Sequence, residues 1–548
     1  MTVTEAPRAA DDEVVAAPSP PPAPTGLAAW VGSGDPRTIG RLFVGTSLVF
    51  LLVSGVAGAL VGFEQFPSDS KTIMGADTVV RVTTLHATAG LFLGVLPLLI
   101  GLAIAVVPLQ VGASTVAFPR ASAAAYWTWL VSGGIVLLSY AVDGGPYGSD
   151  RTAVGMYVLG LIAVLVALVI ATVSVVTTVL ALRAPGMGLR RAPLFTWSML
   201  VGGTVWILTL PVLAAMLLLT YVDLNYGQQF LGGSGGIWNH VAWAFWQPTV
   251  YVFAVPALGV IADVVPVFAR RRHQRHSGAM VLLGLAAALG FGAWVQLGAT
   301  VDGKTPAPWL HGGVWITVGY ISVVPVLGLL GLWTATLFKG RPRLGTPLVL
   351  SLFAGLLVLA GVAGGIATVV GALDLVNTTW MTAQAEVVLI GALLAGLAGV
   401  TFWAPKLYGR LVPDWLMRLA GTLIFIGAAA TAVGFGVAGF LDQARFTNGG
   451  ISAVASGDVS TVEGLDLVAA LGLTVVVVGA LLAAVALLAR GTRDPGDDPW
   501  DGHTLEWTTS SPPPIGNFAS VPAITSEAPL YDSRYAPRDD ATDAEGSA

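Results

Sequence analysis

The chain contains about twelve uninterrupted apolar runs, each long enough for a helix that crosses a lipid bilayer, which takes about 20 residues. The runs are continuously apolar and do not alternate, which indicates helices and excludes the strands of a membrane barrel. Only 10% of the residues are charged and 55% are hydrophobic, so lipid is the expected solvent. We therefore expect an all-α integral membrane protein. The runs are 42–63, 82–107, 122–142, 152–182, 196–221, 238–269, 278–300, 310–338, 347–373, 379–403, 417–441 and 463–489.

The composition divides the chain into three regions. Residues 1–36 are rich in Ala and Pro and are expected to be a disordered tail. Residues 37–490 hold the apolar runs and form one expected membrane domain. Residues 491–548 are a polar tail in which the stretch 499–532 has a less generic sequence.

The positions of Lys and Arg predict the orientation in the membrane. With the N-terminus inside, the inner loops between helices carry fourteen of these residues and the outer loops carry five. Both termini are therefore expected in the cytoplasm, with the helices in the plasma membrane of a bacterial-type cell. No basic stripe suggests nucleic acid as a partner. The chain has no cysteine, which excludes thiolate metal sites and iron–sulfur clusters.

Six motifs, in the same order along the chain, resemble the heme-copper oxidase superfamily, in particular subunit I of cytochrome c oxidase. The resemblance extends from about residue 40 to residue 532 and implies the twelve-helix arrangement of that subunit. The motifs are LHA at 85–87 with VPLQVGA at 107–113 and AFPR at 117–120, LPVLA at 210–214, HVAWAFWQPTVY at 240–251, FWAPKLYGR at 402–410, TLEWT at 504–508, and SPPP at 511–514 with NF at 517–518.

The resemblance also implies a set of histidine ligands, and this chain departs from it. The family holds two hemes and a copper ion with six histidines. Only His86 matches a ligand position, because Gln247 replaces the first copper ligand and Gln296 lies near the expected adjacent pair. The expected pair in the tenth helix falls on Ala383 and Ala385, or on Gln384 and Glu386, depending on the register. The relay glutamate of the sixth helix is Thr249, whereas Tyr251 is kept.

Two ionisable residues within the predicted spans are the main site candidates. His86 is either a structural histidine or the ligand of a heme or another metal. Glu386 is either a site for a proton or a cation, or a hydrogen-bond partner of Gln384 or His86. We expect Asp263, at the inner end of the sixth helix, to form an ion pair with the arginines at 270–272.

Three functions remain open on these observations. The first is a non-catalytic, subunit-I-like membrane protein, a pseudoenzyme that acts as a scaffold or partner subunit in a respiratory or copper-enzyme complex. The second is a redox protein that holds a single heme through His86. The third is a transporter or channel that uses an emptied cofactor cavity lined by Glu386, Gln296 and Gln247. No cofactor is the leading expectation, with one heme as the alternative, and the expected partners are lipid and other membrane subunits.

Overall fold

The computed structural model describes residues 26, 30–65, 74–227, 230, 237–245, 247–292, 321, 323–369, 373–445, 459–489 and 491–535. The chain divides into two units, residues 1–33 and residues 34–548, and the helices described below belong to the second unit, apart from the first helical turn at residue 30. Within the described residues, ten helices are long and apolar enough to cross a membrane, and two shorter apolar helices begin at His276 and Val323. These two correspond to the expected runs 278–300 and 310–338, parts of which lie outside the described residues. The fold is thus the expected all-α membrane fold of about twelve transmembrane helices.

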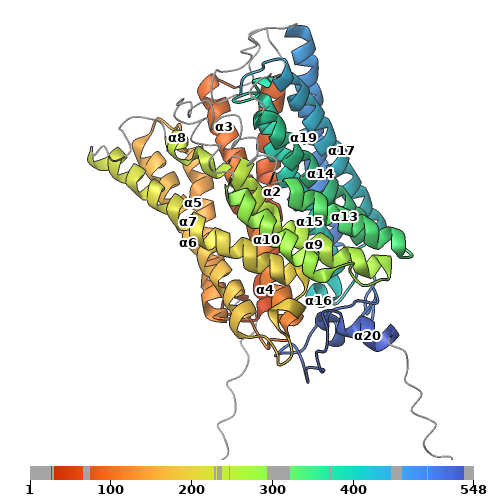
Figure 1. The fold of residues 1–548 in the computed structure, drawn as a ribbon. Helices are drawn as coiled ribbons and strands as arrows, with labels where there is room; N and C mark the ends of the chain where they lie inside the picture. Colours follow the sequence, from red (N-terminus) through yellow and green to blue (C-terminus); the bar gives the residue numbers. More distant parts are fainter. Residues whose placement is uncertain are drawn as a thin grey trace, which may run out of the picture. The chain divides into compact units, whose positions relative to one another are not determined.

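The helices succeed one another along the chain (Figure 1). Their bounds are α2 Pro36–Gln65, α3 Ala76–Thr88, α4 Leu96–Val111, α5 Pro119–Ala141, α6 Arg151–Ala181, α7 Leu194–Tyr226, α8 Ile237–Val241, α9 Gln247–Ala269, α10 His276–Gly292, α13 Val323–Lys339, α14 Thr346–Val369, α15 Thr379–Phe402, α16 Ala404–Tyr408, α17 Asp414–Phe440, α19 Val459–Leu488 and α20 Pro529–Tyr535.

The second membrane span is not one regular α-helix. Between α3 and α4, residues Ala89–Val95 form a π-helical segment, so the span runs continuously from Ala76 to Val111. Few α-helices contain a π-helical segment, but those that do often carry it at a functional site. Here the π segment begins three residues after His86.

Helices from the two ends of the sequence pack side by side. The first long helix, α2, lies against α4 and also against α19, the last long helix, while α15 packs against α9, α14 and α17. Small residues permit the close approach: a Cβ added to Gly101 of α4 would lie 2.4 Å from the Cβ of Phe43 on α2. The spans that include α4 and α9 are almost completely buried, so they form the centre of the bundle.

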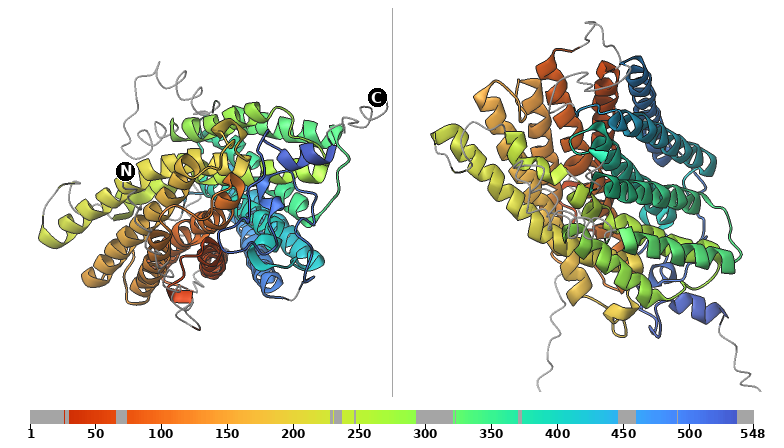
Figure 2. Two further views of the ribbon diagram at one scale, coloured as in Figure 1. Left: turned by 90° about the horizontal axis from the view of Figure 1, so that it is seen from below. Right: turned by 45° about the horizontal axis from the view of Figure 1, so that its top comes forward.

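The C-terminal segment packs against one end of the bundle. In Figure 1 this dark-blue segment, with α20, lies at the lower end of the helices, beside α16, and the right-hand view of Figure 2 shows the dark-blue segment at the same end. Leu505, Glu506 and Trp507 form a buried 3-10 turn there. Lys406 of α16 donates hydrogen bonds to the carbonyl oxygens of Asp497 and Thr509, at 2.9 and 2.6 Å. Residues 491–535 are therefore folded against the bundle although their composition is polar.

Candidate functional site

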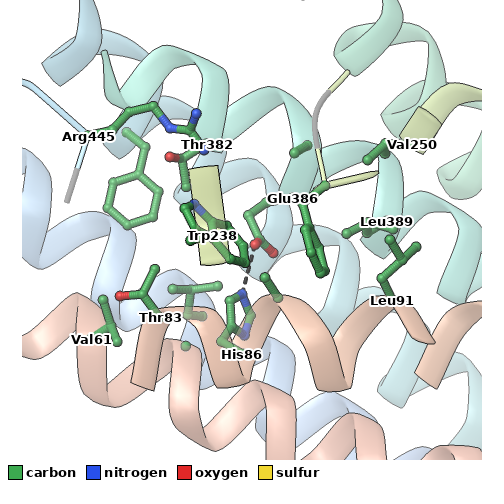
Figure 3. A pocket seen from close by; sticks show the side chains of 16 residues that line it. Val61, Thr83, His86, Leu91, Trp238, Val250, Thr382, Glu386, Leu389 and Arg445 are labelled. Atoms are coloured by element: carbon green, nitrogen blue, oxygen red, sulfur yellow. Dashed lines mark hydrogen bonds and ion pairs between the residues drawn. The ribbon is translucent and has the colours of Figure 1, made fainter. Parts of the chain in front are cut away.

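His86 and Glu386, 300 residues apart, form a polar contact inside the bundle. The Nε2 atom of His86 lies 2.7 Å from Oε1 of Glu386, which joins α3 to α15 (Figure 3). The Nδ1 atom lies 2.8 Å from the carbonyl oxygen of Ser54 on α2. Both ring nitrogens are thus engaged, one by a backbone oxygen and one by a carboxyl group. This contact is one of the two hydrogen bonds that the sequence suggested for Glu386.

The residues of α2 explain why the imidazole fits in this position. Ser54 also donates from its hydroxyl to the His86 carbonyl oxygen, at 2.8 Å. One turn further along α2, Gly58 presents no side chain, and an added Cβ would lie 2.7 Å from the imidazole. A serine and a glycine four residues apart on one helix face therefore form the seat of His86. Small residues four positions apart permit close approach of a neighbouring helix. The sequence carries this pattern at Ser54 and Gly58, outside the motifs that resemble the oxidase family.

The His86–Glu386 pair lies between two cavities. The larger, of about 830 Å³, is lined by this pair together with Trp238, Phe245 and Arg445 (Figure 3). The second, of about 590 Å³, contacts the same two side chains from the direction of Ser54. The two side chains are 19% and 14% exposed, so they contact these cavities while remaining largely enclosed.

Arg445 contributes a positive charge to the larger cavity. Its backbone N–H donates to the carbonyl oxygen of Asn377 at 2.9 Å, which fixes this connection beside the start of α15. Burial lowers the pKa of the Arg445 guanidinium to about 10. The group nevertheless stays charged at neutral pH, so the lining of the cavity holds the cation of Arg445 as well as the carboxyl group of Glu386.

Tyr251 and Gln384 do not line this cavity. The Tyr251 hydroxyl donates to the carbonyl oxygen of Gly361 on α14, at 3.3 Å. Gln384 also donates to α14, at Gly364, so it is not the partner of Glu386. Both residues hold α14 to its neighbours. Gln296 and the side chain of Gln247 lie outside the described residues, so their expected place in a transport cavity stays a prediction.

A second buried polar cluster lies at the end of the bundle that carries the C-terminal segment. Gln110 donates to Oδ2 of Asp263 at 2.8 Å and to Oε1 of Glu506 at 3.1 Å, and it accepts from Thr196 at 2.7 Å. Trp403 also donates to Glu506, at 3.0 Å. Burial raises the pKa of the Glu506 carboxyl group. This network links α4, α7, α9 and α15 to the tail.

The prediction for Asp263 was wrong. Its carboxylate accepts hydrogen bonds from the backbone N–H groups of Leu194 and Phe195, at 2.9 and 3.2 Å, and none of its recorded contacts is with Arg270, Arg271 or Arg272. The first N–H groups of a helix have no partner inside it and attract a carboxylate. The partner of Asp263 is therefore the start of α7 and not the arginines.

The described residues do not provide the ligands of the cofactors that the family resemblance implies. Copper needs several imidazoles at one point, and no group of three or more His, Asp or Glu side chains within the described part of the chain converges to hold a metal. For an iron ligand, the Ser54 carbonyl holds Nδ1 of His86 in the usual supporting manner. Nε2, however, is hydrogen-bonded to Glu386. A copper site does not fit these residues, and an iron bond at His86 requires Glu386 to move away.

Comparison with known proteins gives consistent matches. The family model "Cytochrome C and Quinol oxidase polypeptide I" matches residues 38–481. Cytochrome c oxidase subunit 1 of Bacillus subtilis is 30% identical over 530 residues, which cover 93% of this chain and 84% of that protein. The same subunit of Thermostichus vulcanus is 29% identical, with 93% of both chains covered. A solved heme-copper terminal oxidase dimer shares the fold, with a TM-score of 0.64, 15% identity and coverage of 90% and 89%.

These matches overturn one expectation drawn from the sequence. We expected no cofactor, because most histidine ligands of the family are missing. Members of the matched family carry hemes and copper, so a cofactor-free protein is not the default for a chain with this ancestry. The family model covers most of the chain, and the relatives align over more than nine tenths of it. The chain belongs to the family of cytochrome c and quinol oxidase polypeptide I.

Proposed function

We propose that this chain is a membrane subunit of the oxidase family that does not reduce O2 at a heme–copper centre of its own and that acts as a partner subunit in a respiratory membrane complex. The observation that carries the proposal is the pairing of the one retained ligand position, His86, with Glu386. A carboxyl group of α15 engages the nitrogen that would otherwise bind iron.

The residues of α15 support the same proposal. On either register, the two positions that correspond to histidines in the family are Ala383 and Ala385, or Gln384 and Glu386. Alanine offers no ligand atom, and Gln384 is turned to the backbone of α14. Gln247 stands at the copper-ligand position of α9, and an amide is a poor copper ligand.

The proposed partner role is consistent with the parts of the fold that are kept. The buried network of Gln110, Asp263 and Glu506 holds the end of the bundle to the docked tail. We further propose that both termini face the cytoplasm, as the Lys and Arg distribution indicates.

The test of the proposed function is the copper content of the purified chain, measured beside a catalytic relative prepared in the same way. Less copper than the relative is expected, and an equal content overturns the proposal.

A single-heme protein is the second candidate, because one cavity brings together His86 and Arg445. An imidazole supported at Nδ1 and a cation suited to a carboxylate are the groups that a heme would use. When bound, such a group would supply one-electron chemistry. The absorbance spectrum of the purified protein tests it: a heme band that is lost in His86→Leu supports this candidate, and a spectrum without a heme band excludes it.

A further inference from the structure

We infer that the end of the bundle beside α20 carries a binding site for a phosphate-bearing anion, formed by the loop after α9 and the loop after α13. An open cavity of about 1290 Å³ lies between these loops and α20. This site is separate from the His86–Glu386 cavity and does not depend on the proposed function. Six cationic side chains line it: Arg270, Arg271, Arg272, Arg275, Lys339 and Arg341.

Backbone hydrogen bonds, not charges, hold the two basic loops together. The N–H of Arg341 donates to the carbonyl oxygen of Ala269 at 3.0 Å, and the N–H of Arg343 donates to that of Phe268 at 2.9 Å. Arg271 adds a side-chain bond to the carbonyl oxygen of Lys339 at 2.8 Å. The fold therefore brings like charges into proximity, which is unfavourable unless an anion offsets it.

The described residues around the cavity supply little negative charge to offset its six cations. No carboxylate is among the described residues that line the cavity. Arg272 pairs with Asp532 and lies 4.0 Å from Glu527. The recorded acceptor of Lys339 is the amide oxygen of Gln274, at 3.3 Å, which is uncharged. The positive charge of the cavity thus exceeds what its surroundings neutralise.

The backbone of the first loop is itself unusual. Arg270 and Arg275 both have positive φ angles, 53° and 56°, a left-handed conformation that is uncommon for residues other than glycine. Both residues line the cavity. Arginine side chains arranged around one concave space are suited to phosphate, because the planar guanidinium donates two parallel hydrogen bonds to its oxygens.

The general preference for basic residues on one side of a membrane explains only part of this arrangement. It accounts for the sign of the charge on these loops. It does not account for their gathering around one cavity whose other wall is formed by Tyr531 and Tyr535 of α20, with ring centroids 4.7 Å apart. A site shared by two loops and the C-terminal helix is specific to this surface.

The test uses the full chain in nanodiscs of phosphatidylcholine. One arm titrates inorganic pyrophosphate by calorimetry, and the other measures capture of a short-chain phosphatidylglycerol by native mass spectrometry. The variant Arg270→Gln/Arg341→Gln removes two cavity charges at exposed positions. The control Arg120→Gln/Arg190→Gln removes two exposed charges outside the cavity.

We expect the cavity variant to weaken binding by about tenfold or more, as is typical for loss of charge-assisted hydrogen bonds, while the control remains near the wild type. Binding of pyrophosphate identifies a soluble ligand, and binding of the phospholipid alone identifies a headgroup; either supports the site. No binding in either arm, or equal losses in the two variants, overturns it.

Discussion

Leucine substitutions of His86 and Glu386, singly and together, measure how far this pair stabilises the bundle. Removing one partner of a buried ion pair costs about 3–5 kcal/mol in the free energy of unfolding. The two side chains keep 19% and 14% exposure to the adjoining cavities, so we expect the lower end of that range, about 3 kcal/mol, for Glu386→Leu. The loss arises because the imidazole keeps its bond to Ser54 but is left with a buried nitrogen that has lost its partner.

The double variant separates the pair from its surroundings. Replacing both members by apolar residues leaves neither side chain of the pair with a polar atom that has lost its partner, so the double variant is expected to lose less than the sum of the single losses, by about 1–2 kcal/mol. The assay is reversible unfolding in mixed micelles, followed by tryptophan fluorescence. Glu463→Leu, at a half-buried position of α19, removes the same charge and serves as the control. Additive losses, or a neutral Glu386→Leu, would refute the reasoning.

Three further predictions concern the seat of His86 and the docked tail. Gly58→Ala should cost about 1–3 kcal/mol by forcing a Cβ against the imidazole, whereas Gly45→Ala, on the same helix with open space around it, should not destabilise; equal thermal stabilities would contradict this. Lys406→Met leaves the carbonyl oxygens of Asp497 and Thr509 without their donor, so hydrogen exchange in the tail should accelerate; unchanged protection would argue against that role. Burial lowers the pKa of His503 to about 4 from 6.5, so the unfolded tail binds more protons between these values and docking should weaken as pH falls through that window. Hydrogen exchange corrected for its intrinsic pH dependence measures this, and His503→Gln should reduce the effect.

The membrane fold could be predicted from the sequence because length and apolarity alone define a span. The boundaries were less accurate: the run expected at 82–107 belongs to a span from Ala76 to Val111, interrupted by a π-helical segment. Such a segment has no clear signature in an apolar sequence, because every residue in it is compatible with a regular helix.

The candidate site was only partly predictable, for a reason of distance along the chain. His86 and Glu386 were each singled out as ionisable groups inside spans, but their contact across 300 residues depends on how α3 packs against α15. The error at Asp263 has a similar origin, since a residue near arginines in sequence was bound instead by the start of α7. The expectation of no cofactor rested on missing ligands alone and did not hold against the family to which the chain belongs.

The most direct test of the proposed function is the rate of O2 uptake by the purified chain, supplied with reduced cytochrome c or a quinol and compared with a catalytic relative under the same conditions. The account predicts no uptake above the protein-free background, because His86 is paired with Glu386 and α15 provides no imidazole. Turnover comparable to that of the relative would contradict it.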